Sequence, residues 1–344
     1  MIVNACSPPE EVDPETAHQL AQPDGQPVAY GDPMRIFIAG ATGAIGRRLV
    51  PLLLAEGHQV TALTRRRGGS SVAGAGEAGG RRTGGGSPVD GGGVRAVVGD
   101  VYDVGRLREV VAEARPEVVM HQLTDLASRD FAANSRIRRE GTRNLVDAAL
   151  AADVRRVVSQ SIAWAYEPGA TPAAESTPLD LHATDATRRA TVEAVATLEA
   201  ITAEAPEWVV LRYGMLYGPD TWYTKGGLMA DLATTGKLPT GPDVTSFLHV
   251  DDAATAAAAA LTWPTGAVNI VDDTPAPASA WAPAFAESVG VSPDVLADHR
   301  ARDGQREPDP STARTPWARG ASNAHARSLG WIPTHPTWHT GFTS

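Results

Sequence analysis

The chain has 344 residues, of which 42% are hydrophobic, and its formal net charge at pH 7 is −10. A chain of this length can bury about three quarters of its unfolded surface, in one large domain or in two smaller lobes. Acidic and basic residues are interspersed, which argues against a nucleic-acid-binding surface. No apolar run reaches about 18 residues, which argues against a membrane span. We therefore expect the partner to be a small-molecule substrate, with neither nucleic acid nor membrane involved.

The N-terminal segment predicts a disordered extension over residues 1–33. It is acidic and Pro-rich, without sustained periodicity, and it lacks the basic and then apolar regions of a secretory signal. Its Cys6 is the single cysteine of the chain, so an intramolecular disulfide is excluded and a cysteine-based metal site is not expected. These features favour a cytoplasmic protein without a metal centre.

Short apolar strands alternate with helices from residue 34 onward. Strands are expected at 35–40, 58–64, 94–99, 117–123, 154–161 and 208–214. Because helical segments separate them, the pattern predicts an α/β fold in which residues 34–214 form a Rossmann-type, doubly wound parallel sheet. A further strand is expected near 267–272, and the Gly-rich run 67–93 is predicted to be a mobile loop. Residues 215–266 and 273–344 are expected to form a small C-terminal substrate-binding lobe.

A glycine-rich segment, GATGAIG, lies between the first expected strand and the first helix. Its first glycine permits a tight turn, its second lets the backbone approach a pyrophosphate, and its third lets helix and strand pack closely. The N-terminus of the helix then faces the negatively charged phosphates. The segment therefore predicts a dinucleotide site formed by Gly40, Thr42, Gly43, Ala44, Ile45 and Gly46.

The end of the second strand bears on which nicotinamide cofactor is used. A carboxylate at this place would bind the ribose hydroxyls of NAD(H), but the strand is followed by Arg65 and Arg66. Guanidinium groups suit the 2′-phosphate of NADP(H), with which they form charge-assisted and often forked hydrogen bonds. We therefore expect NADP(H) as the cofactor, and the alternative is that these arginines start a solvated basic loop.

Several blocks, taken together and in order, resemble the extended short-chain dehydrogenase/reductase family of the NAD-dependent epimerase/dehydratase type. They are GATGAIG (40–46), GDVYD (99–103), HQLTDL (121–126), GTRNLVDAA (141–149), VVSQSIAWAY (157–166), LRYGMLYGP (211–219) and FLHVDDAA (247–254). The resemblance implies further cofactor contacts near the adenine, after the fourth strand and near the nicotinamide, from Asp100 and Val101, Leu123 and Thr124, and Tyr213, Gly214 and Leu216. It also implies that Ser161 stands at the position of the family's catalytic serine.

The family's chemistry normally uses a Tyr and, four residues later, a Lys on the helix after the fifth strand, and this pair is absent. Aligning the family's helix glutamate with Glu199 puts Thr191 and Val195 at the two positions. The lysine cation normally lowers the pKa of the phenol, which then exchanges a proton with a substrate oxygen. Neither lysine of the chain, Lys225 or Lys237, lies in this helix. The standard acid is therefore missing, and the helix face is expected to be core.

Two residues near the end of the fifth strand are candidates for the missing proton chemistry. Tyr166 follows Ser161 by five residues, at the sheet edge where ligands bind in open α/β folds. We predict that Ser161 donates a hydrogen bond to a substrate oxygen and that Tyr166 is the proton donor, with pocket lining as the alternative role of Tyr166. Arg319 is a candidate anchor for an anionic or oxygenated substrate, with a surface salt bridge as its alternative.

Three functions remain open on the sequence. The first, which we favour, is an NADP(H)-dependent reductase of a ketone or enone with a non-standard proton donor. The second is a non-redox cyclase, dehydratase or epimerase on the same fold, and the third is a nucleotide-sensing regulator without turnover. Trp164, Tyr217 and Trp222 are expected around the cleft and favour an apolar or aromatic substrate, such as a polyketide or another secondary metabolite. The resemblance leaves a homodimer and a monomer both open.

Overall fold

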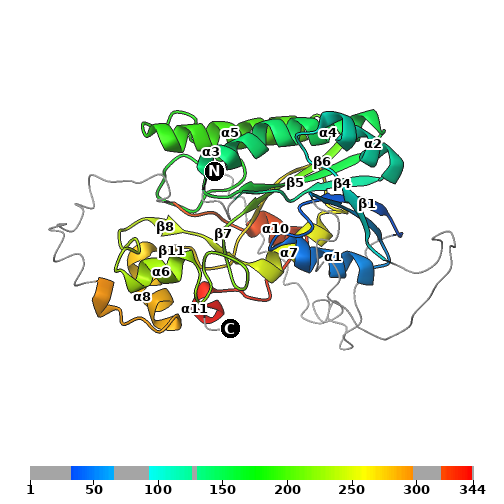
Figure 1. The fold of residues 1–344 in the computed structure, drawn as a ribbon. Helices are drawn as coiled ribbons and strands as arrows, with labels where there is room; N and C mark the ends of the chain where they lie inside the picture. Colours follow the sequence, from blue (N-terminus) through cyan, green and yellow to red (C-terminus); the bar gives the residue numbers. More distant parts are fainter. Residues whose placement is uncertain (1–31, 66–92, 126–129, 297–318, 343–344) are drawn as a thin grey trace, which may run out of the picture.

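The computed structural model describes residues 32–65, 93–125, 130–296 and 319–342. Within these residues, seven parallel strands form one sheet in the order β10-β6-β5-β4-β1-β2-β3 (Figure 1). The strands are β1 (Arg35–Ala39), β2 (Gln59–Thr64), β3 (Arg95–Val98), β4 (Val118–His121), β5 (Arg156–Ile162), β6 (Glu207–Tyr213) and β10 (Gly266–Ile270). The predicted α/β class, with a Rossmann-type doubly wound parallel sheet, is confirmed.

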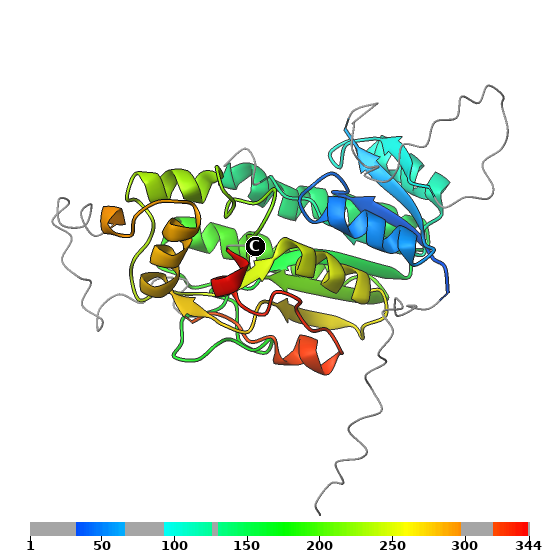
Figure 2. The same cartoon turned by 90° about the horizontal axis from the view of Figure 1, so that it is seen from below.

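Helices cover both faces of this sheet (Figures 1 and 2). One face carries α2 (Val104–Ala114), α4 (Thr142–Ala151) and α5 (Ala186–Thr202), and α3 (Phe131–Arg136) with the π-helix η2 (Ile137–Gly141) leads into α4. The other face carries α1 (Gly46–Ala55), α7 (Val250–Ala259) and α10 (Ala324–Ser328). The sheet and its helices therefore form a three-layer α/β/α unit.

The first strand shows why its sequence, RIFIA, is a continuous apolar run. Ile36 and Ile38 pack in the core cluster that includes residues of α1 and α7, whereas Phe37 and Ala39 pack in the cluster that includes residues of α2 and α4. Successive side chains of a strand point to opposite faces. A central strand covered by helices on both sides must therefore be apolar at every position.

A smaller lobe lies beside the three-layer unit (Figure 1). It is built from β7 (Met215–Tyr217), α6 (Leu228–Thr234), β8 (Val244–Thr245), β9 (Phe247–His249), β11 (Ala276–Pro277), α8 (Ala278–Ser288) and α11 (Trp338–Gly341). Its core is aromatic, and Phe247 lies edge-on to both Tyr223 and Phe342 at centroid distances of 5.2 Å.

The structure differs from the predicted lobe, 215–266 and 273–344, in two helices, of which α10 packs on β10 of the sheet. Helix α7 falls inside this range, but it packs on α1 within the core cluster of the sheet. Its alanine-rich sequence has small side chains, which permit close approach of the two helices. Helix α7 therefore belongs to the three-layer unit.

The predictions of a disordered segment over 1–33 and of a mobile loop over 67–93 fall, apart from residues 32, 33 and 93, outside the described residues. No helix of the described residues is long and apolar enough to cross a membrane.

Candidate functional site: the dinucleotide cradle and the adjoining cleft

The turn after β1 is shaped for a ligand that approaches its backbone. Gly40 has a φ of 106°, and a Cβ added there would lie 2.3 Å from the carbonyl oxygen of Gln122. A Cβ on Gly46 would lie 2.2 Å from the carbonyl oxygen of Gly40. A side chain at either position would require the backbone to shift, so glycine lets α1 start directly against the turn.

The middle of this turn faces outward. Thr42 and Gly43 are exposed, Ala44 is half-buried, and Ile45 is buried in the core. The accessible backbone lies at the N-terminus of α1, where N–H groups and the helix dipole favour a phosphate. The six residues predicted from GATGAIG therefore come together in one cradle that fits a pyrophosphate.

Arg65 lies where the second strand ends. Together with Asp100 and Arg106 it lines a shallow pocket at the carboxyl ends of β2 and β3. The Arg106 guanidinium donates to the Val98 carbonyl oxygen at 3.2 Å and to Glu109 at 3.0 Å. Arg65 is exposed and forms no ion pair with any residue that the structure describes. Its charge is therefore available beside the pocket where the adenine end of a dinucleotide is expected.

Other predicted cofactor residues lie along the carboxyl edge of the sheet. Val101 is buried, and its carbonyl oxygen accepts a hydrogen bond from the Asn144 amide at 2.8 Å. Leu123 and Thr124 follow β4 directly and are half-buried and exposed, respectively. Arg66 lies outside the described residues.

The residues at the end of β6 and just after it lie partly in the core and partly along the cleft. The Tyr213 side chain is buried, and its hydroxyl donates to the Ala253 carbonyl oxygen at 3.3 Å. Burial raises the pKa of this phenol. Leu216 is half-buried within β7, and Gly214 lines the cleft described below. Any contact of Tyr213 with the nicotinamide must therefore come from its backbone.

The sheet face beneath α5 carries a buried polar network. Ser161 of β5 and Arg212 of β6 are partners in the strand register, and Glu199 of α5 accepts hydrogen bonds from both. Ser161 donates through Oγ at 2.7 Å, and the Arg212 guanidinium donates through Nε at 2.9 Å and Nη2 at 2.6 Å. Burial alone would lower the pKa of Arg212, but Glu199 outweighs it and raises that pKa. The Ser161 hydroxyl is thus committed to Glu199.

Tyr166 belongs to the same network. Arg212 donates through Nη1 to the phenol oxygen at 2.8 Å, and the phenol donates to Oδ1 of Asn269 at 2.5 Å. Burial raises the pKa of Tyr166 to about 12. A buried phenol whose donor is already used, and whose pKa is raised, is a poor acid near neutral pH. The geometry favours a structural role, and catalysis by Ser161 and Tyr166 stays a prediction.

The two family positions on α5 are structural here. The Thr191 hydroxyl donates to the Thr187 carbonyl oxygen at 3.0 Å, one turn earlier in the same helix. Val195 is fully buried and packs with Ala165 and Val192. The prediction that this helix face is core is confirmed. Neither side chain can supply a proton at neutral pH, because the pKa of a threonine hydroxyl is far too high and a valine side chain has no acidic group.

His121 of β4 is also unsuited to relay protons. Complete burial lowers its pKa to about 4, so its imidazole is neutral at pH 7. Its Nε2 shares a hydrogen bond with the Thr142 hydroxyl at 2.9 Å, and its Nδ1 accepts from the N–H of Leu123. The imidazole therefore holds β4 against α4.

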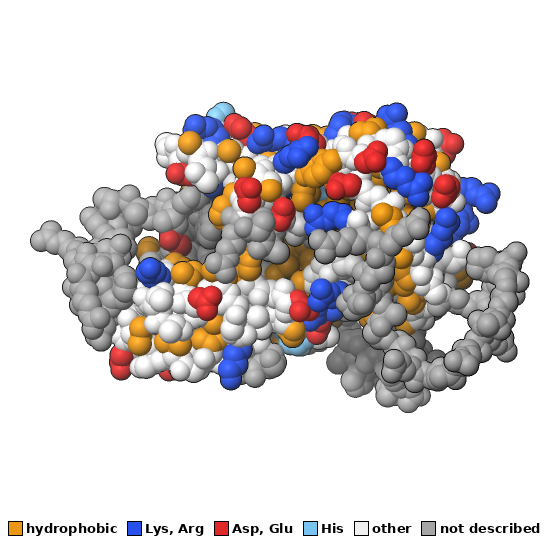
Figure 3. Space-filling model, in the orientation of Figure 1, with side chains coloured by type: hydrophobic (Ala, Val, Ile, Leu, Met, Phe, Trp, Pro, Cys, Tyr) orange, Lys and Arg blue, Asp and Glu red, His pale blue; other side chains and the backbone are white. Residues whose placement is uncertain are grey.

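A narrow cleft is lined by the loop after β5, by Gly214 and the start of β7, by β8 with Ser246, and by the C-terminal segment at Arg319 and Gly320. In Figure 3, hydrophobic side chains lie in the hollow between the upper helical layer and the lower lobe. Trp164 and Arg319 line the cleft, as expected for a substrate pocket. The expectation that Tyr217 lines it is wrong, because this side chain is fully buried in the aromatic core of the smaller lobe. Trp222 packs half-buried against that core and is not among the residues that line the cleft.

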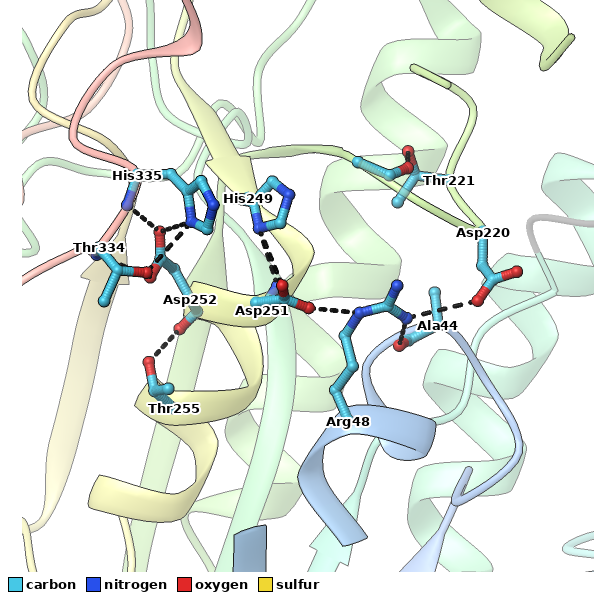
Figure 4. Close-up of polar contacts among 11 residues, drawn as sticks. Ala44, Arg48, Asp220, Thr221, His249, Asp251, Asp252, Thr255, Thr334 and His335 are labelled. Carbon is cyan, nitrogen blue, oxygen red and sulfur yellow. Dashed lines mark hydrogen bonds and ion pairs between the residues drawn. The ribbon is translucent and has the colours of Figure 1, made fainter. Parts of the chain in front are cut away.

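A cluster of His249, Asp252 and His335 joins α7 to the C-terminal segment (Figure 4). The two imidazoles stack at a centroid distance of 3.7 Å, and one ligand atom of each residue lies within 4.8 Å of the others. The buried Asp252 carboxylate accepts from the N–H groups of Thr334 and His335, each at 2.8 Å. His249 Nδ1 accepts from the N–H of Asp251 at 3.2 Å. Because these atoms are already used, the cluster is explained as a structural tie.

His249 is the N-cap of α7, and its side chain accepts from the N–H of Asp251. The Asp251 carboxylate accepts from the Arg48 guanidinium at 2.5 Å, and Arg48 also reaches Asp220 at 3.4 Å (Figure 4). These ion pairs join α1 to the first turn of α7 and to the loop after β7.

Sequence reasoning missed the Glu199–Arg212 ion pair and its link to Asn269. A usable signal was present, because Arg212 interrupts the apolar strand run WVVLRYG. A charge inside a buried strand requires a buried partner of opposite charge. The sequence does not show which acidic residue that partner is.

Comparison with known proteins identifies the family to which this chain belongs. Residues 36–271 match the model of the NAD dependent epimerase/dehydratase family. The chain belongs to this family, and it is an enzyme of the extended short-chain dehydrogenase/reductase type. The cradle and the family agree that its cofactor is a nicotinamide dinucleotide.

One named relative and two solved structures add detail to this family assignment. The chain is 44% identical over 325 residues to the 3-diazoavenalumate denitrifying reductase of a Streptomyces species, covering 90% of this chain and 99% of the relative. The UDP-glucose 4-epimerase of Thermus thermophilus, in complex with NAD, has a TM-score of 0.64 at 22% identity, over 90% of this chain and 97% of that one. The Bordetella bronchiseptica enzyme WbmG, with NAD and UDP, has a TM-score of 0.61 at 21% identity, over 88% and 91%. The two structures share the fold, and the Streptomyces relative marks the protein as oxidoreductase-like.

Proposed function

We propose that the protein is an NADPH-dependent reductase that replaces the diazo group of an aromatic or otherwise unsaturated carboxylate with hydrogen and releases N2. The similarity to the Streptomyces reductase, over nearly the full length of both chains, supports the reaction type. The observation that carries the proposal is the conversion of the α5 acid positions to Thr191 and Val195, beside a phenol whose donor is already used.

Loss of N2 fits a site without a general acid. Reduction of a ketone places negative charge on oxygen, and that oxygen must receive a proton. When a diazonium group is displaced, the C–N bond breaks, its electron pair leaves with N2, and a C–H bond forms at the same carbon. No oxyanion develops, so this reaction does not need a Tyr–Lys pair to donate a proton. Reduction of a ketone or enone would need an acid that α5 does not supply.

The chain's own residues then have positioning roles. The bound NADPH supplies the hydride, as is usual for this cofactor. The turn from Gly40 to Gly46 would hold its pyrophosphate, and Arg65 would pair with its 2′-phosphate. The apolar wall of the cleft, with Trp164, would exclude water that otherwise hydrolyses a diazonium group to a hydroxyl.

The test supplies purified protein with NADPH and a diazonium derivative of cinnamate carrying 15N in the diazo group. We expect NADPH oxidation, labelled N2 and cinnamate, with hydrogen at the ring carbon that carried the diazo group, in equal amounts. Heat-denatured protein is the control, because spontaneous hydrolysis also releases N2 but gives a hydroxycinnamate. Release of N2 without NADPH oxidation, or with hydroxycinnamate as the product, would contradict the proposal.

A further inference from the structure

Arg319 lines the same cleft from its far wall. Its guanidinium lies over the loop after β5, where a Cβ on Gly169 would come within 2.4 Å of Cζ. Glycine at this position therefore makes room for the arginine. The side chain is held where the cleft meets Trp164 and Pro168.

The partners of this guanidinium are backbone carbonyl groups. Nε donates to the carbonyl oxygen of Thr171 at 2.8 Å, and Nη1 donates to that of Glu167 at 3.3 Å. These two neutral acceptors fix the orientation of the guanidinium plane, but they do not neutralise the charge of the guanidinium. Among the described residues no carboxylate pairs with Arg319, so the surface salt bridge considered from the sequence is absent from this part of the chain.

Several other partly or fully buried arginines are paired with carboxylates, whereas the buried Arg138 and the partly buried Arg189 have no carboxylate partner among the described residues. Arg212 is paired with Glu199, Arg188 with Asp180, and Arg156 with Glu207. A half-buried arginine that has oriented donors but no anion, beside an apolar cleft, is a ready partner for an anionic ligand. The free Nη2 edge suits a carboxylate because a guanidinium is planar and always charged.

We propose that Arg319 is the specificity-determining residue that binds the carboxylate of the substrate, while the apolar wall of the cleft takes its unsaturated or aromatic part. This inference rests on the proposed function for the class of substrate, but binding can be measured without turnover. It predicts that the cleft distinguishes an acid from a neutral isostere of the same shape.

The test measures binding of cinnamate and of cinnamide to the protein saturated with NADP⁺, by calorimetry. We expect the wild type to bind cinnamate about tenfold more tightly than cinnamide, which corresponds to one charge-assisted hydrogen-bonded contact. Arg319→Met should remove this preference and leave cinnamide binding unchanged, and Arg319→Lys should retain part of it. Arg95→Met, which removes an equal charge at the exposed start of β3, is the matched control and should behave as the wild type.

Three results would overturn the inference. The first is equal binding of both probes to the wild type, or binding of neither. The second is an unchanged preference in Arg319→Met. The third is an equal loss of both probes in that variant, which would show that Arg319 only holds the loop. If the acid preference depends on Arg319 but no N2 is released from a diazonium substrate, the binding site stands and the proposed reaction falls.

Discussion

The turn after β1 and the middle of α5 both belong to the family's reaction site, and they have opposite characters in this protein. The turn is open, with Thr42 and Gly43 exposed and with glycines where any side chain would collide with backbone. The helix is closed, since Val195 is fully buried and Glu199 is engaged by both Ser161 and Arg212. The protein therefore retains a turn that can bind a hydride-donating cofactor. The positions of the family's proton donor on α5 are instead occupied by side chains that pack in the core.

The largest expected effect on cofactor binding concerns the open region. Gly46→Val should weaken NADPH binding by about 100-fold, because a strain of about 3 kcal/mol against backbone cannot be relieved by moving a side chain. Calorimetric titration with NADPH measures this, with thermal unfolding as a check on folding. Gly105→Ala is the control, because the nearest atom to a Cβ there is 3.8 Å away. Unchanged binding in Gly46→Val would show that the turn is not the cradle.

A substitution in the closed region should change the free energy of unfolding of the protein. Glu199→Ala should lower the free energy of unfolding by about 3–5 kcal/mol, because it leaves the Arg212 guanidinium buried without its partner. Chemical denaturation measures the change. Glu109→Ala removes one side of an exposed ion pair on α2 and should barely move the midpoint. A small loss in Glu199→Ala would mean that the network contributes little to the fold.

A more moderate effect is expected at the adenine end of the cradle. Arg65→Ala should weaken NADPH binding by about tenfold, the equivalent of one charge-assisted hydrogen bond, and leave NADH binding unchanged. Titration of both nucleotides separates the 2′-phosphate from the rest of the cofactor. Equal weakening of the two would remove the argument for NADPH.

The smallest effect is expected at Tyr166. Tyr166→Phe should keep turnover within about threefold of the wild type, although it deletes a buried hydrogen bond worth about 1 kcal/mol. Because burial raises the pKa of Tyr166 to about 12, the wild-type rate should show no inflection from this phenol between about pH 6 and 9. A loss of turnover in Tyr166→Phe greater than about 100-fold, with the fold intact, would restore the phenol as the acid.

The two regions were also unequally predictable. The segment GATGAIG could be recognised because its requirements are local. A Cβ added to any of its glycines would meet atoms of the same turn or of the backbone at the end of the adjoining strand. The Ser161–Glu199–Arg212 network could not, because its members come from β5, α5 and β6 and meet only when the sheet register is set.

Aromatic residues were the least predictable part of the cleft. Trp164 lines it, but Tyr217 is fully buried in the smaller lobe. An aromatic side chain suits a pocket wall and a core equally well by composition. Only the packing of β7 against β9 and α11 decides between them.

The most direct test of the account is the origin of the new hydrogen in the reduced product. The reaction is run once with NADPH deuterated at nicotinamide C4, separately on each face, in ordinary water, and once with unlabelled NADPH in deuterium oxide. We predict that deuterium enters the product carbon from one face of the cofactor and that none enters from the solvent. Deuterium from the solvent at that carbon would show that a proton donor acts there after all.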